Sequence, residues 1–105
     1  MPKSRPYSRI KAQVLDLVGE IPAGRVTTYG ALAEAVGVAP RQAAFVLANE
    51  PEAAGVPWHR VVAAGGRLSI PDPHHKAEHA RRLRREGVPV VAGRVRNFSS
   101  RFYAP

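Results

Sequence analysis

The chain has 105 residues and a formal net charge of +8, from 16 Lys or Arg against 8 Asp or Glu, and it contains no cysteine. That length supports one domain with a modest core, so we expect a single module over residues 1–105. The absence of cysteine excludes disulfides, thiolate metal sites and catalysis by a thiol. The charge favours nucleic acid as the partner. The preference for Arg over Lys suits bidentate phosphate contacts, although a GC-rich or thermophilic genome would explain that preference equally well.

The sequence also bears on location. Its start, MPKSRPYSR, lacks the apolar stretch of a signal peptide, and no apolar run approaches the roughly 18 residues needed to cross a bilayer. We therefore expect no membrane association, and a cytoplasmic, nucleoid-associated monomer in a bacterial or archaeal cell.

The beginning of the chain predicts a helix followed by a turn. Ser8 is the candidate N-cap and Gly19 the candidate end of the helix. The Pro and Gly residues within 21–26 predict the turn. We expect the helix to be core scaffold, because apolar residues recur in it at helical spacing (Ile10, Val14, Leu17 and Val18).

Two short helices follow, separated by a short turn that contains glycine. Thr28 is the candidate N-cap of a helix over 29–36, which Gly37 ends, and Pro40 takes the first position of a helix that continues to Ala48. This arrangement is typical of a helix-turn-helix. Such a corner also occurs in helical proteins that do not touch DNA, so the positive charge is what favours DNA binding here.

The rest of the chain predicts a loop, a hairpin and one more helix. Residues 50–58 form the loop, and 61–63 and 68–70 are the arms of a small hairpin that turns at Gly65 and Gly66. Asp72 caps a helix over 73–85, an extended segment covers 88–91, and a basic tail covers 94–105. The predicted fold is mainly α with a small β-hairpin, a winged-helix-like helix-turn-helix domain.

Three blocks of sequence resemble the O6-alkylguanine-DNA alkyltransferases: IPAGRVTTYG at 21–30, PWHRVV at 57–62 and EGV at 86–88. That family transfers an alkyl group from damaged guanine to a cysteine thiolate in the second block. Trp58 occupies the cysteine position here, and an indole is not a useful alkyl acceptor. The chain is therefore identified as a member of the cysteine-less alkyltransferase-like proteins. The resemblance implies that it corresponds to the C-terminal domain of the alkyltransferases, and we expect it to lack the N-terminal domain that usually precedes this one.

The resemblance implies that the helix-turn-helix enters the minor groove and that the target nucleotide rotates out of the duplex into a pocket. Tyr29 would help this rotation, and Trp58 would stack on the extruded base, a contact worth about 1–3 kcal/mol. The alternative is that both aromatic side chains are core residues. The predicted lesion pocket comprises Tyr29, Pro57, Trp58, His59 and Ser69.

The resemblance also implies an arginine, on the second helix of the helix-turn-helix, that fills the gap left by the flipped base. The aligned position holds Ala44, and Arg41, one turn earlier, is a candidate substitute or a phosphate contact. The predicted DNA-contacting residues are Thr28, Tyr29, Arg41, Gln42, Ala44 and Arg60.

His59 and Glu86 match residues that relay a proton from the thiol through water in the alkyltransferases. Because no thiol is present, we expect His59 to be a structural residue behind the pocket, paired with Glu86 through water. Asn49 matches a hinge residue that pins the active-site loop, and a helix C-cap is the alternative. The loop over 69–73 departs from the family's Gly-Tyr-Ser pattern and carries two prolines, so lesion selectivity does not transfer.

His75 and His79 lie four residues apart on one predicted helical face, a spacing compatible with zinc, beside His74 and Glu78. No third ligand is apparent. We therefore expect solvated or phosphate-facing histidines, with no metal and no cofactor.

These observations predict a non-enzymatic sensor that flips O6-alkylguanine and holds it. The resemblance implies that the occupied site is flagged for nucleotide excision repair, with the damage-recognition ATPase of that pathway as partner. One alternative is a helix-turn-helix transcription regulator that reads undamaged DNA through Arg41 and Gln42. Another is a general DNA binder without lesion preference. An alkyltransferase with another acceptor conflicts with the lack of cysteine.

Overall fold

The structure, a computed structural model, describes residues 6–105. The segment MPKSRPYSR, on which the signal-peptide prediction rests, lies partly in 1–5, outside the described residues. The elements along the chain are α1 (Tyr7–Gly19), β1 (Thr27–Thr28), α2 (Tyr29–Val36), α3 (Pro40–Asn49), the 3₁₀ turns η1 (Pro51–Gly55) and η2 (Trp58–Arg60), β2 (Val61–Val62), the 3₁₀ turn η3 (Ala64–Gly66), α4 (Pro73–Arg85), β3 (Val90–Val91), β4 (Arg94–Val95) and α5 (Phe98–Arg101).

The ends of α2, α3 and α4 are where local signals predict them. The Thr28 Oγ1 atom accepts a hydrogen bond from the Ala31 backbone N–H at 3.0 Å, and Gly37 ends α2 in the left-handed region at φ +87°. Pro40 is the first residue of α3, and Asp72 caps α4 by accepting from the His75 N–H. The predicted cap of α1 is wrong: the helix begins at Tyr7, after the extended Pro6, so that Ser8 lies inside it.

The axes of α2 and α3 differ in direction by 106° across their short connection. This angle is in the range of helix-turn-helix corners, which confirms the predicted motif. Within residues 6–105 no single helix has the length and apolar composition of a membrane span; α2 and α3 meet that test only together, across this bend.

The predicted hairpin over 61–70 is wrong in place, although the fold class is confirmed. Residues Val61 and Val62 pair in parallel with β1, and Leu68 donates to the Gly93 carbonyl, so both arms pair mainly with distant partners. One backbone bond joins the two arms around the predicted turn, from the Ala63 N–H to the Arg67 carbonyl at 2.8 Å. The antiparallel hairpin is β3–β4 instead. Its two-residue turn at Ala92 and Gly93 has positive φ at both positions, as tight hairpin turns require.

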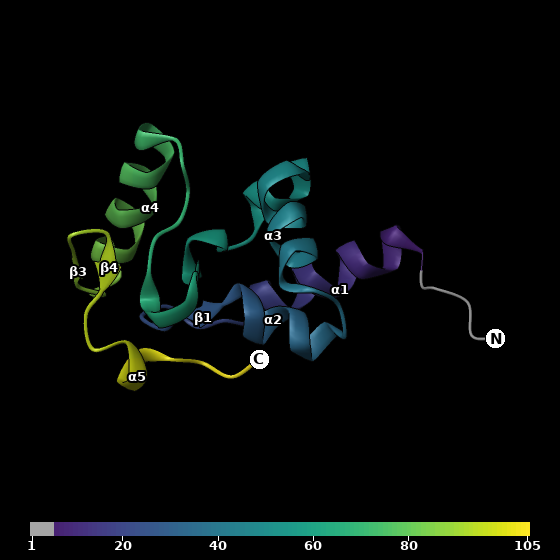
Figure 1. Cartoon of the computed structure of the whole chain (residues 1–105), viewed down its shortest axis with the longest axis horizontal. Coiled ribbons are helices and arrows are strands. Elements are labelled where there is room, and N and C mark those ends of the chain that lie inside the picture. Colours follow the sequence, from purple (N-terminus) through teal and green to yellow (C-terminus); the bar gives the residue numbers. More distant parts are fainter. Residues whose placement is uncertain (1–5) are drawn as a thin grey trace.

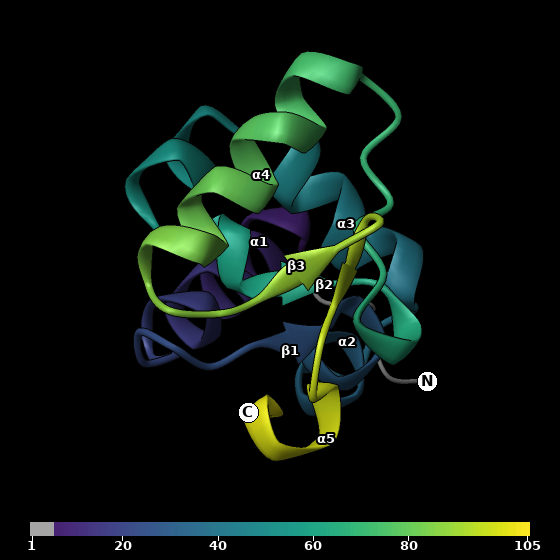
Figure 2. The same cartoon turned by 90° about the vertical axis from the view of Figure 1, so that its left-hand side faces the viewer.

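Residues 6–105 form two hydrophobic cores that meet at the β1–β2 pair. The first lies among α1, α2 and α3, and the second lies among β2, α4, β3 and β4. Figure 1 shows the first three helices on one side, α4 with the hairpin on the other, and β1 between them. In Figure 2 the β3–β4 ribbon runs beside α4. The tail then returns to β1, where the Tyr103 N–H donates to the Val26 carbonyl at 2.7 Å.

Candidate functional site

A cavity of about 340 Å³ opens between α2–α3 on one side and the chain before α4 on the other. This volume lies at the lower end of the range for small-molecule pockets. Its walls are mostly apolar side chains, interrupted by Asp72 and His75 near the start of α4. The lining residues are Tyr29, Ala44, Leu47, Ala48, Trp58, Ile70, Pro71, Asp72 and His75.

Trp58 is the first residue of η2 and is half-buried against α4. The His75 and His79 rings meet the indole with centroid distances of 4.8 and 5.3 Å, and the Arg82 guanidinium lies 5.1 Å from its centroid. These contacts fix one side of the indole while another part lines the cavity. The alternative that Trp58 is a core residue does not hold in this structure.

Tyr29 is the first residue of α2, so the N-cap at Thr28, which fixes the start of the helix, also fixes the backbone position of Tyr29. The ring is half-buried and lines the same cavity as Trp58. Burial raises the pKa of its hydroxyl, which therefore stays neutral and able to donate a hydrogen bond at physiological pH. The structure thus brings together the two aromatic residues predicted for the pocket.

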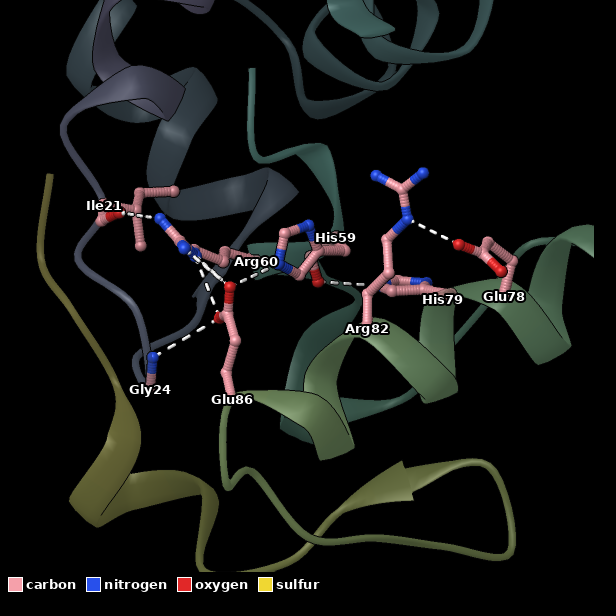
Figure 3. A network of polar contacts seen from close by, with 8 residues as sticks. All are labelled: Ile21, Gly24, His59, Arg60, Glu78, His79, Arg82 and Glu86. Carbon is pink, nitrogen blue, oxygen red and sulfur yellow. Dashed lines mark hydrogen bonds and ion pairs between the residues drawn. The ribbon is translucent and has the colours of Figure 1, made fainter. Parts of the chain in front are cut away.

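Behind Trp58, the next two residues of η2 are held by the Glu86 carboxylate (Figure 3). The His59 Nε2 atom lies 2.8 Å from Glu86 Oε2, and the Arg60 guanidinium donates to both carboxylate oxygens. The Arg60 side chain also donates to the Ile21 carbonyl at 2.7 Å. The predicted partnership of His59 and Glu86 is therefore present, but the contact is direct rather than through water.

Burial opposes ionisation of Glu86, but hydrogen bonds from Arg60 and His59 outweigh it and lower the pKa of the carboxyl to about 2. The backbone N–H of Gly24 also donates to this carboxylate at 3.4 Å. Gly24 has φ +85°, a conformation that favours glycine and turns its N–H toward Glu86. One carboxylate thus links the end of α4, η2 and the loop between α1 and β1.

His79 provides a second support for the same turn. Its ring is buried, and its Nε2 atom donates to the His59 carbonyl at 2.8 Å. Burial lowers the pKa of His79 to about 4, so its ring is neutral at physiological pH. His75 and His79 both pack on Trp58, which replaces the expectation that they are solvated or phosphate-facing. Within residues 6–105 no group of three or more His, Cys, Asp or Glu residues is arranged to hold a metal ion.

The predicted DNA-contacting residues have different environments. Arg41 is exposed on α3, and Ala44 lines the cavity. Gln42 is exposed, but its Oε1 atom accepts from the Ala39 N–H at 2.9 Å and helps to begin α3. The structure revises the prediction for Arg60: its side chain is 18 % exposed, and Glu86 and a backbone carbonyl occupy its guanidinium.

Three other predicted residues lie away from the cavity walls. Pro57 is half-buried and Ser69 is exposed, and neither lines the cavity; the neighbouring Ile70 and Pro71 take that place. The Asn49 side chain donates to the Phe45 carbonyl at 3.0 Å. It therefore acts at the end of α3, as the C-cap alternative has it, rather than on the following loop.

Sequence reasoning missed several lining residues. Leu47 and Ala48 follow Ala44 by three and four residues, so helical spacing from Ala44 was an available signal for both. His75 drew attention only as a metal candidate, although it also lies in the wall. Ile70 carries no local signal, because its position depends on the long-range pairing of the segment before it with β4.

A helix-turn-helix beside an aromatic-walled cavity, in a chain of net charge +8, is typical of a DNA-binding domain. The family of the DNA-binding domain of 6-O-methylguanine DNA methyltransferase matches residues 9–88. The chain belongs to this family, and its resemblance to the alkyltransferase-like proteins is confirmed.

Two curated relatives are similar to most of the chain. The "Bifunctional methyltransferase/endonuclease" of Thermoplasma volcanium is 41% identical over 86 residues, which are 79% of this chain and 27% of that protein. The "DNA base-flipping protein" of Escherichia coli K12 is 41% identical over 80 residues, 74% of this chain and 61% of that protein. The chain thus spans less than two thirds of either relative.

The fold is also that of a solved complex. The crystal structure of Schizosaccharomyces pombe Atl1 with damaged DNA containing O6-carboxymethylguanine superposes with a TM-score of 0.84 at 31% identity. The match covers 97% of this chain and all of that one. It confirms the fold class over nearly the whole length.

Proposed function

We propose that this protein is a DNA damage sensor that flips O6-alkylguanine out of the duplex and holds it without removing the alkyl group. The observation that carries the proposal is the position of Trp58 in the wall of an apolar cavity that also contains Tyr29. The absence of cysteine removes the usual acceptor. Relatives called a DNA base-flipping protein and Atl1, the latter crystallised with damaged DNA, support the same function.

In this proposal α2 and α3 approach the minor groove, and the Tyr29 ring presses on the backbone beside the target nucleotide. The extruded base stacks on the exposed part of Trp58. The bonds from Glu86 to His59 and Arg60 hold η2 in place, so the indole does not have to be ordered when the base arrives. Prior ordering reduces the entropic cost of binding.

The later steps are part of the same proposal. Because the protein holds the lesion without repairing it, the complex must be recognised by another activity, and we infer that this is nucleotide excision repair acting through its damage-recognition ATPase. The protein acts as a monomer in the cytoplasm, associated with the nucleoid of a bacterium or archaeon.

The test compares two duplexes of identical sequence, one with guanine and one with O6-methylguanine at the same position. We expect tighter binding to the lesion duplex, and intact-mass measurement should find no methyl group on the protein. Trp58→Ala should reduce the preference for the lesion roughly tenfold, because it removes one aromatic stack, while affinity for the undamaged duplex is retained. Val91→Ala, which trims another exposed apolar side chain, is the control.

Each opposite result is informative. Equal affinity of the unmodified protein for both duplexes would indicate a general DNA binder. Transfer of the methyl group would indicate an enzyme with an unusual acceptor. A Trp58→Ala variant that discriminates as well as the unmodified protein would show that the cavity is not the lesion pocket.

A further inference from the structure

Many cationic side chains of the described residues have a partner within the protein. Lys11, Arg60, Arg81 and Arg82 pair with carboxylates, and Arg84 and Arg101 donate to backbone carbonyls. Three exposed cations around the β3–β4 hairpin differ from these, and we call them the hairpin cluster: Arg67, Lys76 and Arg94. Within residues 6–105 none of the three takes part in an ion pair.

The fold brings the three cations together from separate segments. Arg67 and Arg94 oppose each other in an isolated antiparallel bridge, and Cβ atoms of opposed residues are about 4.5–5.5 Å apart. Lys76, near the start of α4, reaches the turn of the hairpin, where its Nζ atom lies 3.5 Å from the position that a Cβ atom would take at Gly93. The hairpin cluster is therefore one surface with three positive charges.

This arrangement is unfavourable in the free protein. Like charges directly opposite each other on paired strands are destabilising. The acidic residue closest to Lys76 in the sequence is Asp72, and its carboxylate is used to cap α4 by accepting from the His75 N–H at 2.8 Å. An anion from outside the chain would relieve the repulsion. Because the three charges are exposed and come from three segments, a polyanion fits them better than a single small ion.

The hairpin cluster lies beyond the loop that forms one wall of the cavity. Ile70 and Pro71 of this loop line the cavity, and the Leu68 N–H ties the loop to the hairpin by donating to the Gly93 carbonyl at 2.9 Å. Figure 1 shows the hairpin beside α4, on the far side from α3. In Figure 2 the tip of the hairpin lies next to the loop, on the same side of the picture as α2 and α3. A duplex that lies across α3 and the cavity would reach the hairpin next.

The turns beside the cluster leave room for a nucleic-acid backbone. Gly65 and Gly93 both have φ +73°, a conformation that favours glycine, and neither carries a side chain that would hold a ligand away. The Arg94 guanidinium lies over the first of these turns, with an Nη atom 3.1 Å from the position that a Cβ atom would take at Gly65. A phosphate could therefore approach Arg94 and the backbone of the turn together.

We propose that the hairpin cluster is a second DNA-binding surface, which binds phosphates on one flank of the flipped nucleotide, beyond the loop before α4. The inference rests on the proposed function for the position of the duplex across the cavity. Phosphate contacts fix the position of a protein on DNA but carry no information about the bases. The cluster should therefore strengthen binding to damaged and undamaged duplexes by the same factor.

The salt dependence of binding to an undamaged duplex tests this surface. We compare the double variant Arg67→Gln/Arg94→Gln with Arg81→Gln/Arg85→Gln, which removes the same charge from the other end of α4. Each phosphate contact contributes about 0.9 to the slope of the logarithm of the association constant against that of the salt concentration. The slope should fall by roughly 2 in the hairpin double variant and change little in the control. Lys76→Gln alone should lower it by about 0.9.

The length of the duplex locates the contact. O6-methylguanine is placed near one end of a duplex or near the other, so that one flank at a time is removed. Loss of one flank should weaken binding of the unmodified protein but not of the hairpin double variant, and loss of the other flank should weaken both equally. Urea unfolding should find the double variant at least as stable as the unmodified protein, because a like-charge pair has been removed.

The inference is overturned if the hairpin double variant and the α4 control have the same salt dependence, or if both flanks affect the double variant as they affect the unmodified protein. Unchanged DNA binding by the double variant would also overturn it and would indicate an acidic protein segment as the partner of the cluster. Failure of the proposed function gives a different pattern: no preference for O6-methylguanine over guanine, with the salt dependence on undamaged DNA still lowered in the hairpin double variant.

Discussion

The two sides of the η2 turn differ sharply, although they are formed by three consecutive residues. Trp58 presents its indole to an apolar cavity, where part of its surface has no protein neighbour. His59 and Arg60 face the opposite way and are bonded to Glu86, with the Arg60 side chain 18 % exposed and that of Glu86 17 % exposed. One side of the turn faces the cavity, and the other is held by hydrogen bonds to Glu86.

This difference shows how a small domain positions an aromatic side chain without burying it completely. Packing Trp58 on all sides would fix it but would close the cavity. Here the fixing contacts are made by its two neighbours, and by His75, His79 and Arg82 against one part of the indole. In the alkyltransferase family the matching His and Glu relay a proton from a reactive thiol. Here the contact between His59 and Glu86 holds the turn that carries the Trp58 indole.

The largest expected effect comes from breaking the hydrogen bonds that Glu86 makes with His59 and Arg60. Glu86→Gln should lower the free energy of unfolding by about 3 kcal/mol, because Arg60 keeps a largely buried charge without its counter-ion. The difference in stability between Glu86→Gln and the unmodified protein should become smaller in acid. The unmodified protein itself loses this stabilisation as the pH falls from the ordinary value near 4.5 toward the folded pKa of about 2. Urea unfolding at several pH values measures both.

Glu78→Gln is the matched control for this change. Glu78 lies on α4 and pairs with Arg81 and Arg82, but near the surface, where solvent screens the pairs, so its removal should cost much less than that of Glu86. Equal losses for Glu78→Gln and Glu86→Gln would contradict the special role of the internal carboxylate.

A smaller effect is expected from His79, whose ring supports η2 through the His59 carbonyl. Burial lowers its folded pKa to about 4 from the ordinary value of 6.5, so the unfolded chain takes up a proton first as the pH falls. The protein should lose about 2 kcal/mol of stability from this group between pH 7 and pH 5. His79→Gln should show a correspondingly flatter stability profile in that interval; an unchanged profile would assign the pH dependence to other groups.

The sequence correctly predicts helix ends that depend on local signals. It does not predict structure that depends on pairing between strands far apart in the chain. Thr28, Gly37, Pro40 and Asp72 each act within a few residues, and each is at the predicted helix end. The hairpin was misplaced because Val61 and Val62 pair with β1, some thirty residues earlier in the chain. Nothing in the residues after Val62 indicates that pairing.

The same distinction holds for the site. Trp58 and Tyr29 were found through their blocks of sequence, and both line the cavity. Arg60 was misassigned because an arginine in a basic chain indicates an external contact, and only the fold brings Glu86 within reach of it. Ser69 was predicted to line the cavity, but the next two residues, Ile70 and Pro71, line it instead. The prediction chose the right loop and missed the lining residues by one position.

The smallest effect concerns Arg82, a charged side chain of α4 that packs on the cavity side of the turn. Arg82 lies over the Trp58 ring at 5.1 Å and also pairs with Glu78. A double-mutant cycle of Arg82→Gln and Trp58→Leu, measured by urea unfolding, should give a coupling energy of about 0.5–1 kcal/mol, typical of an exposed cation–π contact. A parallel cycle with Arg81→Gln should give no coupling energy, because Arg81 pairs with Glu78 and not with the indole.

The same contact should affect DNA binding. Arg82→Gln should loosen Trp58 and weaken lesion binding slightly, without affecting binding to undamaged DNA. A coupling of zero would mean that the histidines and the bonds of η2 alone position the indole.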